Sequence, residues 1–263
     1  MKNYFVIGNP IDHSLSPKLH NYWIKKNKIE ATYDKILLNK DDIKDVILKV
    51  KNDEIHGLNV TLPFKNSVIP FMDKLSPESE ISESVNTIYK DGNKIIGHNT
   101  DIAGFELGIR HIKYNLKGKK VFILGSGGVV PSIIISVKKM GASKIIVSNR
   151  TKKKAENLKK KFKEIEIFDW GKIPIFDVII NATSLGLNNE DEIKINYTED
   201  DSNKLFYDLI YNPKETIFLK KAKLSGNKTE NGKMMFIYQA HQAFTIWHKI
   251  MPEIDDETIK LLD

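Results

Sequence analysis

The sequence predicts an α/β protein with two domains, and three observations support this prediction. Apolar runs of strand length alternate with segments of helical periodicity along the chain. One such run, Val121–Leu124, stops at a glycine-rich turn, and a second apolar run of helical length follows it. The chain has 263 residues, enough to bury a substantial core in one large domain or in two smaller ones.

The segment Lys119–Ser136 has the pattern that opens a dinucleotide-binding βαβ unit: a buried strand, a tight glycine turn and a helix start. Gly125 permits the turn, and Gly127 lets the backbone approach a pyrophosphate at the helix N-terminus. The third small position of the pattern is filled by Val130 instead of glycine. A glycine turn before a buried helix is also common in proteins that bind no nucleotide. The residues around the next strand are therefore needed to distinguish a nucleotide-binding turn from a purely structural one.

That next strand is expected at Lys144–Ser148, and no acidic residue stands at its end to bind the ribose of NAD. The chain instead continues with Asn149, Arg150 and Thr151, and then with three lysines. Only two of the 41 basic residues are arginines, so an arginine at this point suggests that bidentate geometry matters. A guanidinium group suits a 2′-phosphate, and Thr151 is expected to cap the helix that follows. We therefore predict that the cofactor is NADP(H).

Composition argues against several functional classes. The net charge of +7 comes from scattered lysines without an arginine-rich patch, which favours attraction of small anions over binding of nucleic acid. Without cysteine the chain has no disulfide, thiolate zinc site or cysteine nucleophile. The N-terminal apolar run Tyr4–Ile7 is too short for a signal peptide, and no window is long enough for a membrane span. We expect a cytoplasmic protein without a membrane partner.

The first hundred residues should form the sheet of a first domain. Strands are expected at residues 3–8, 31–38 and 55–60, a helix near 41–50, and a hairpin over 85–99. Ser16-Pro17 reads as a helix start, with the serine as N-cap and proline at the first helical position. Ser14 and Ser16 would also place two hydroxyl groups at a helix N-terminus, which suits a small carboxylate.

Polar residues follow the third of these strands. Asn59, Thr61 and Lys65 fall in or just after a strand-to-helix turn that Pro63 fixes, where active-site groups of α/β proteins collect. In a lysine-rich chain, Lys65 alone is weak evidence for catalysis. Asp101 has two interpretations: it caps the next helix, or it is a charged site residue where the first domain meets the second.

The chain after the glycine turn continues the second sheet. Buried strands are expected at 176–180 and 205–210, followed by polar turns that begin near Asn181 and Tyr211 and face the cofactor crevice. A helix is expected at 214–224, and a long helix over 231–250, in which Gln239 is a polar residue within an apolar pattern.

The motifs in this order resemble those of the shikimate dehydrogenase family. They run from residue 8 to residue 240, so the resemblance covers nearly the whole chain. The matching segments are SLSPKLHN, NVTLPFK, VNT, NTD with Gly104, the Gly125-Ser-Gly-Gly turn, SNRT, NATSLGL, YDLIYNP and NGKMMFIYQA.

The resemblance implies an oxidoreductase that reversibly reduces 3-dehydroshikimate to shikimate with NADPH, a step of aromatic amino acid biosynthesis. It implies an N-terminal α/β substrate domain, residues 1–101, which C-terminal helices at 235–263 complete. Residues 102–234 would form a Rossmann-type, doubly wound NADP domain. The enzyme would need no metal and would be a monomer or a homodimer.

The resemblance also implies roles for individual residues. Lys65 and Asp101 would be the catalytic pair: an ammonium that stabilises and protonates the oxygen formed by hydride transfer, and a carboxylate that holds it. Ser14, Ser16 and Tyr211 would bind the substrate carboxylate, and the pocket would be completed by Asn59, Thr61, Asn86 and Gln239. The cofactor would be bound by Gly125, Ser126, Gly127, Gly128, Val129, Asn149, Arg150, Thr151, Lys154, Thr183, Ser184, Leu209, Gly232 and Met235.

The sequence departs from the family pattern in places. His98 stands where the family often has an acid, and Val130-Pro131 stands where small and basic residues are usual. Met234 replaces a glycine of the family, and we expect its side chain to pack into the helices instead of over the nicotinamide. Two alternatives remain: a relative that uses quinate or NAD, and a non-catalytic NADP-binding relative, against which intact Lys65 and Asp101 argue.

Overall fold

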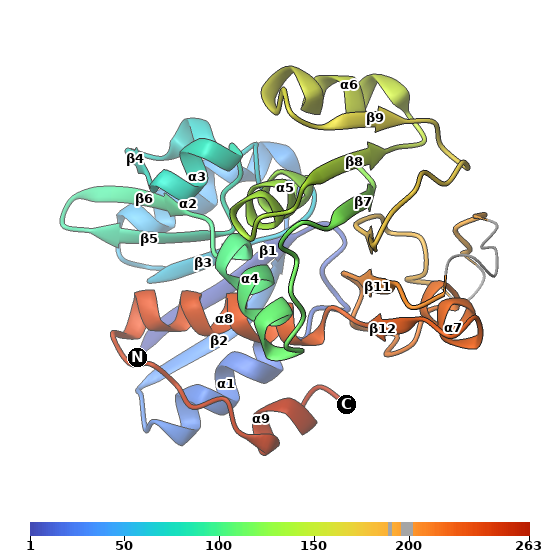
Figure 1. Cartoon of the computed structure of the whole chain (residues 1–263). Helices are drawn as coiled ribbons and strands as arrows, with labels where there is room; N and C mark the ends of the chain where they lie inside the picture. The colour runs from blue at the N-terminus through green and yellow to red at the C-terminus, as the bar shows by residue number, and fades with distance from the viewer. Residues whose placement is uncertain (189–190, 196–201) are drawn as a thin grey trace. The chain divides into compact units, whose positions relative to one another are not determined.

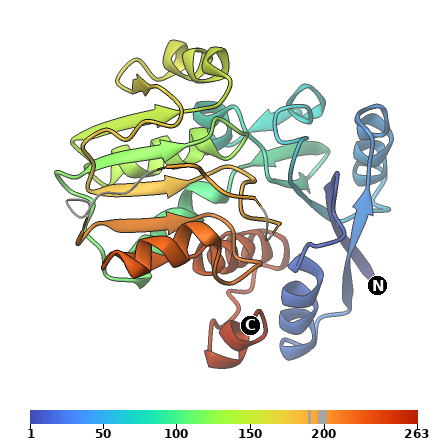
Figure 2. The same ribbon diagram turned by 90° about the vertical axis from the view of Figure 1, so that its right-hand side faces the viewer.

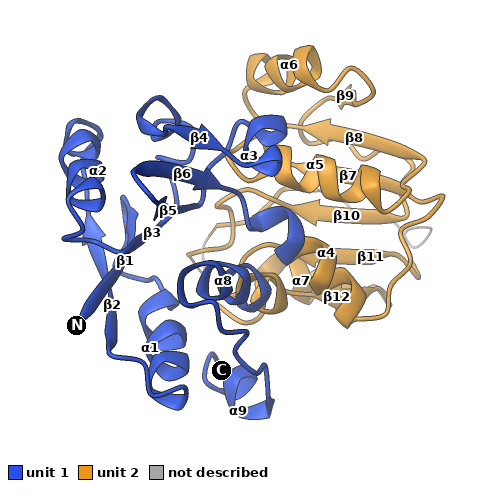
Figure 3. Ribbon diagram, turned by 90° about the vertical axis from the view of Figure 1, so that its left-hand side faces the viewer, with its two compact units in different colours: residues 1–104, 237–263 blue, residues 105–236 orange. Residues whose placement is uncertain are grey.

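The computed structural model describes residues 1–188, 191–195 and 202–263. The chain forms two compact units: unit 1 comprises residues 1–104 and 237–263, and unit 2 comprises residues 105–236 (Figure 3). Figure 1 follows the chain through its strands and helices. The functional division expected at residues 101 and 234 stays a prediction. Among the described residues, no helix is both long and apolar enough to cross a membrane.

Unit 1 is built on a mixed six-stranded sheet. The strand order is β2 (Ala31–Leu37), β1 (Lys2–Gly8), β3 (Gly57–Val60), β5 (Thr87–Asp91), β6 (Lys94–His98) and β4 (Lys74–Leu75). β1 runs parallel to β2 and β3, whereas β5 is antiparallel to both β3 and β6. The hairpin turns at Gly92, whose φ of +57° is a conformation that glycine adopts freely. The hairpin predicted over residues 85–99 is confirmed.

Helices bury apolar residues against this sheet. In α2 (Ile43–Lys51), Ile43, Val46, Ile47 and Val50 recur at helical spacing, and all four are buried with residues of β1, β3 and β5. The other helices of this unit are α1 (Ser16–Lys26), α3 (Pro77–Ser82), α9 (Asp256–Lys260) and part of α8 (Lys233–His248); short 3₁₀ turns span Lys40–Asp42 and Ile69–Phe71. Aromatic residues of α1 and α8, including Trp23, Phe244 and Trp247, fill the space beside β1 and β2.

Unit 2 contains a fully parallel six-stranded sheet, whose strands lie side by side in Figure 2. The strand order is β12 (Lys228–Glu230), β11 (Leu205–Asp208), β10 (Val178–Asn181), β7 (Lys120–Leu124), β8 (Lys144–Ser148) and β9 (Glu166–Phe168). From β7 the chain builds the sheet first toward β8 and then toward β10. This reversal creates a switch point at the carboxyl end of β7, where open α/β sheets bind ligands.

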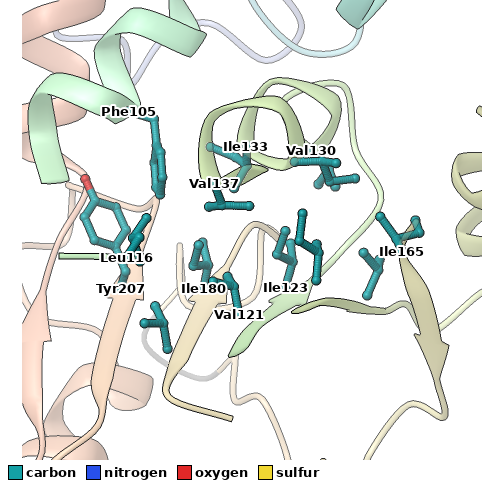
Figure 4. Packing of buried hydrophobic residues seen from close by; sticks show 14 of the residues in the cluster. Phe105, Leu116, Val121, Ile123, Val130, Ile133, Val137, Ile165, Ile180 and Tyr207 are labelled. Atoms are coloured by element: carbon teal, nitrogen blue, oxygen red, sulfur yellow. The ribbon is translucent and has the colours of Figure 1, made fainter. Parts of the chain in front are cut away.

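Successive residues of β7 enter two different cores, as the alternation of side chains along a strand requires. Val121 and Ile123 pack with Ile133 and Val137 of α5 (Val130–Lys139) on one face (Figure 4). Phe122 and Leu124 pack on the other face with a cluster that includes Phe218 and Leu219 of α7 (Ile217–Leu224). The remaining helices of the unit are α6 (Lys152–Lys161) and part of α4 (Asp101–His111). The predicted doubly wound sheet is confirmed.

Candidate functional site

The Lys65–Asp101 pair is the central feature of unit 1. Lys65 Nζ donates a hydrogen bond to Asp101 Oδ2 at 2.6 Å, and the two side chains are only 11% and 6% exposed. The other carboxylate oxygen accepts from Asn86 Nδ2 at 2.9 Å. Two donors therefore fix the carboxylate, while the ammonium group has further N–H donors to offer a ligand.

Asp101 does not cap the helix it begins. Asn99 Oδ1 accepts hydrogen bonds from the backbone N–H groups of Asp101 and Ile102, at 2.9 and 3.4 Å. The Asn99 amide is itself held by Ser82 Oγ and the Ser84 carbonyl. Asn99 thus accepts hydrogen bonds from the first N–H groups of α4, and the Asp101 carboxylate pairs with Lys65 instead. Of the two interpretations of Asp101, capping is wrong.

Asn86 and Asn59 belong to a buried polar network behind this pair. Besides its bond to Asp101, Asn86 Nδ2 donates to Thr100 Oγ1 at 2.9 Å, and Asn86 Oδ1 accepts from the Thr100 backbone N–H at 2.8 Å. Asn59 Nδ2 donates to the Asn86 carbonyl and to Thr87 Oγ1. Asn59 and Asn86 are buried, so both amides are held in place by protein groups.

The helix start near Ser16 differs from the sequence-based prediction. Ser16 is the first residue of α1, its N-cap position is Leu15, and no side chain makes a capping hydrogen bond there. The preceding turn closes earlier, because the Ser14 N–H donates to the Ile11 carbonyl. Ser14 Oγ accepts from the Ser16 N–H at 3.3 Å. The prediction that Ser16 is the N-cap and Pro17 the first helical residue is wrong.

The remaining predicted substrate residues lie in different elements. Thr61 follows β3 directly, and its N–H donates to the Ile7 carbonyl at 2.9 Å. Gln239 is half-buried on α8 and belongs to unit 1. Tyr211 belongs to unit 2, where its ring stacks on Phe236 with the ring centroids 4.4 Å apart. Within unit 1 the structure brings together Lys65, Asp101, Asn86 and Asn59.

In unit 2 the glycine turn has the geometry that a phosphate site needs. Gly125 has φ +114°, and a Cβ there would lie 2.7 Å from the Ala182 carbonyl oxygen, so only glycine fits. A Cβ on exposed Gly127 would meet nothing within 4 Å, which leaves open space over the turn, flanked by Ser126, Gly128 and Val129. Val130 begins α5 and is fully buried in the core. The missing third glycine is explained by this core position.

The loop after β8 presents several polar side chains. Arg150 is exposed and forms no ion pair with any residue in the described ranges. Thr151 occupies the N-cap position of α6, as predicted, but its side chain makes no capping hydrogen bond. Asn149 Nδ2 donates to the Thr151 carbonyl and fixes the loop. Lys154 is exposed on the first turn of α6.

The other predicted cofactor residues surround the ends of β10 and β11. Asn181 Oδ1 accepts from both the backbone N–H and the hydroxyl of Thr183, ahead of Ser184, and the Leu209 N–H donates to the Asn181 carbonyl. A Cβ on Gly232 would lie 2.1 Å from the Leu209 carbonyl oxygen, so this glycine permits two backbone segments to touch. Met235 packs in the core of unit 2.

Met234, where the family has glycine, is only 4% exposed. Its thioether side chain is therefore already buried among protein atoms, as the packing interpretation requires. His98, where the family often has an acid, has its Nδ1 2.5 Å from Ser76 Oγ and 3.6 Å from a Glu78 carboxylate oxygen.

Sequence reasoning missed Asp208, the last residue of β11. It is fully buried, and burial raises the pKa of Asp208 to about 6. Its carboxylate accepts from Asn181 Nδ2 and the Ile210 N–H, both at 3.0 Å, and from Thr216 Oγ1 at 2.6 Å. Asp208 thereby joins the two polar turns that follow β10 and β11. An acid at the end of a buried strand, in LFYD, was the signal available in the sequence.

These features define a class of protein. A parallel sheet with a glycine turn at its switch point, followed beyond the second strand by an arginine without an acidic partner among the described residues, is a Rossmann-type dinucleotide-binding unit. Here that unit shares its chain with an α/β unit in which a half-buried lysine pairs with a buried aspartate. The combination is that of a dinucleotide-dependent oxidoreductase.

Comparisons with known proteins give the family. Residues 6–88 match the model of the shikimate dehydrogenase substrate binding domain, and residues 106–216 match that of shikimate / quinate 5-dehydrogenase. A shikimate dehydrogenase (NADP(+)) from Pelagibacter ubique is 63% identical over 262 residues, covering 100% of this chain and 99% of the relative. The chain belongs to the shikimate dehydrogenase family, as its motifs predicted.

Solved structures agree with this assignment. The crystal structure of shikimate dehydrogenase from Aquifex aeolicus matches with a TM-score of 0.88 and 33% identity, over 100% of this chain and 97% of that one. A shikimate 5-dehydrogenase from Thermus thermophilus, solved in complex with NADP(H) and shikimate, matches with a TM-score of 0.89 and 27% identity, over 100% and 98% of the two chains.

Proposed function

We propose that this protein catalyses the reversible, NADPH-dependent reduction of 3-dehydroshikimate to shikimate. The name of the Pelagibacter ubique relative, at 63% identity, supports both the reaction and the cofactor. The observation that supports the chemistry most directly is the Lys65–Asp101 pair. A shielded ammonium group, hydrogen-bonded at 2.6 Å to a carboxylate that an amide holds in place, is suited to proton transfer at a carbonyl oxygen.

The residues of unit 2 fit NADP(H). The open space over Gly127 accommodates a pyrophosphate close to the backbone at the start of α5. Arg150, which has no acidic partner among the described residues, and the uncapped hydroxyl of Thr151 are free to bind a 2′-phosphate. Thr183, Ser184, Leu209, Gly232 and Met235 complete the proposed cofactor set.

The chain's own residues provide the proton and the orientation. When bound, the cofactor supplies the hydride. Lys65 hydrogen-bonds the oxygen of the ring carbonyl, stabilises the negative charge that develops on it and donates the proton. Asp101 keeps the ammonium in position and accepts a hydrogen bond from the neighbouring ring hydroxyl. In the oxidative direction, Lys65 takes the proton back.

We assign the substrate carboxylate to the hydroxyl groups of Ser14 and Ser16, at the start of α1, and of Tyr211. The partly positive end of α1 and its first backbone N–H groups favour an anion there. Thr61 and Gln239, both half-buried, are assigned together with Asn59 and Asn86 to the rest of the substrate pocket.

A crossed assay tests this function. Reduction of the nicotinamide is followed by absorbance with shikimate or quinate as substrate, each with NADP⁺ or NAD⁺. We expect the highest kcat/KM for shikimate with NADP⁺. Equal rates with quinate would favour the broader enzyme that the name of the second family model includes. No reduction with any of the four combinations would favour the non-catalytic alternative.

A further inference from the structure

We propose that Asp208 is a positioning residue of the cofactor site, whose carboxylate holds the turns after β10 and β11 in the arrangement that receives the nucleotide. This inference rests on the proposed cofactor residues and adds Asp208 to them as a residue that acts through others. Asp208 is the last residue of β11, and it is fully buried. All residues that carry the argument lie in unit 2.

The Asp208 carboxylate connects three segments of this unit. Its Oδ1 accepts from Asn181 Nδ2, at the end of β10, and from the Ile210 N–H of the turn after β11, both at 3.0 Å. Its Oδ2 accepts from Thr216 Oγ1 at 2.6 Å. Thr216 is the N-cap of α7, where its side chain accepts from the Leu219 N–H. One carboxylate thus joins the ends of two neighbouring strands to the start of a helix.

Asn181 extends this connection into the turn after β10. Its Nδ2 also donates to the Leu185 carbonyl at 3.1 Å, and its Oδ1 accepts from the N–H and the hydroxyl of Thr183 at 3.0 and 2.7 Å. A rotated amide would point its oxygen at the Asp208 carboxylate, so Asp208 fixes the orientation in which Asn181 holds Thr183. Thr183 and Ser184 are proposed cofactor residues, and the connection therefore runs from Asp208 to the cofactor site.

The same two turns lie directly against other proposed cofactor segments. A Cβ on Gly125 would lie 2.7 Å from the Ala182 carbonyl oxygen, so the turn after β10 packs on the glycine turn. A Cβ on Gly232 would lie 2.1 Å from the Leu209 carbonyl oxygen, and the Gly232 N–H donates to the Ile210 carbonyl at 3.1 Å. Because these contacts leave no free space, a shift of either turn would move the backbone at Gly125 or Gly232.

Burial makes each bond of this carboxylate consequential. Asp208, Asn181 and Thr216 are each at most 2% exposed, so water does not replace a lost partner at little cost. Burial raises the pKa of Asp208 to about 6, and above this pH the ionised carboxylate only accepts hydrogen bonds. Its removal would leave buried donors of both turns without an acceptor, which costs the full penalty of desolvation unless the turns rearrange.

The test compares Asp208→Ala with Asp255→Ala, after urea titrations have shown that each variant is folded. Asp255 also accepts from a backbone N–H and a threonine hydroxyl at a helix start, both of Thr258, but it belongs to unit 1. Asp208→Ala should raise the Kd for NADP⁺ about tenfold, the upper range for one lost hydrogen bond. The Kd for NAD⁺ should rise by the same factor, because the 2′-phosphate is assigned to another loop. Asp255→Ala should leave both Kd values unchanged, and the KM for shikimate should stay within about twofold of wild type in both variants.

Two milder variants keep the test decisive if Asp208→Ala does not fold. Thr216→Val leaves the Asp208 carboxylate in place and removes the hydroxyl that donates to it. It should raise the Kd for both dinucleotides about threefold, the lower range for one hydrogen bond. Thr216→Ser keeps the hydroxyl and should bind both dinucleotides as wild type does.

A measurement on the cofactor-free protein separates this proposal from the proposed function. Hydrogen exchange at the Thr183 N–H is followed by NMR. We expect faster exchange in Thr216→Val than in wild type or Asp255→Ala, because the Asn181 amide that holds this N–H is less well fixed. Unchanged Kd values in Thr216→Val, or unchanged exchange at Thr183, would overturn the proposal. An inactive wild type whose variants show the expected Kd and exchange changes would overturn only the reaction proposed above.

Discussion

At the scale of single residues, two buried carboxylates are held in different ways. Asp101 faces a lysine ammonium and an amide, so its negative charge has a cation beside it. Asp208 accepts only from neutral groups: an amide, a backbone N–H and a hydroxyl. These donors do not offset its burial, and the pKa of Asp208 is raised to about 6. Asp208 therefore links the turns that follow β10 and β11, and the free-energy cost of burying its charge depends on pH.

This cost leads to a prediction for stability. Because the pKa of Asp208 is above its ordinary value, the folded state binds a proton more readily than the unfolded state. Stability from this group is thus present at low pH and lost as the pH rises through about 6. Relative to Asp208→Asn, wild type should gain up to about 3 kcal/mol in unfolding free energy between about pH 7.5 and about pH 4. Urea titrations across this range measure it.

Asp91→Asn is the matched control, since it removes an exposed carboxylate from the hairpin turn. The difference in unfolding free energy between wild type and Asp91→Asn should not change as the pH passes through about 6. If the difference in unfolding free energy between wild type and Asp208→Asn were constant with pH, the account of Asp208 would be wrong.

Residue types and motifs indicated Lys65 and Asp101, but not what surrounds them. Nothing local in the sequence shows that Asn99 serves the helix N-terminus or that Asp208 bonds Thr216. Tyr33 and Asn59 are 26 residues apart and meet only because β1 lies between β2 and β3. Such partners depend on strand order, which a single sequence does not display.

At the scale of elements, the hydrogen bonds at the start of α1 show which of two serines stabilises the helix N-terminus. Because Ser14 Oγ accepts from the Ser16 N–H, Ser14→Ala should lower the free energy of unfolding by about 0.5–1 kcal/mol. Ser16→Ala removes no capping bond and should cost less. Both variants should raise KM for shikimate. Thermal or urea unfolding of the two variants measures the difference. A larger loss of unfolding free energy in Ser16→Ala than in Ser14→Ala would show that Ser16 is the cap after all.

The loop between β8 and α6 is the element that should select the cofactor. Arg150→Ala should weaken NADPH binding about ten- to a hundredfold, the range for charged hydrogen bonds, and affect NADH little. Lys153→Ala, which removes an exposed charge from the same segment, is the control and should have a smaller effect. Titrations of cofactor fluorescence give the dissociation constants. Equal losses for NADPH and NADH would make Arg150 a structural residue.

Elements with long apolar runs were predicted well, and short ones were missed. The strands at β7 and β8 and the helix α2 follow their apolar patterns closely. Two missed strands, β9 and β12, have three residues each and lie at the edges of the sheet of unit 2. They form because a neighbouring strand offers hydrogen bonds, and their own sequences contain no apolar alternation.

At the scale of the whole molecule, the proposed roles divide between the two units. The proposed catalytic pair belongs to unit 1, whereas the proposed cofactor residues, from Gly125 to Met235, all belong to unit 2. The alternation of strands and helices with one glycine turn was enough to predict the fold class. The mixed strand order of unit 1, in which β5 is antiparallel to β3, was not predictable, because it depends on pairing between distant segments.

The Lys65→Met variant tests this division and the proposed chemistry in one measurement. Its kcat with shikimate and NADP⁺ is measured beside its Kd for NADP⁺. If Lys65 transfers the proton, kcat should fall by roughly two to four orders of magnitude, whereas the Kd should stay within about twofold of wild type because the cofactor residues lie in the other unit. A near-normal kcat, or a Kd that rises as steeply as kcat falls, would contradict the account.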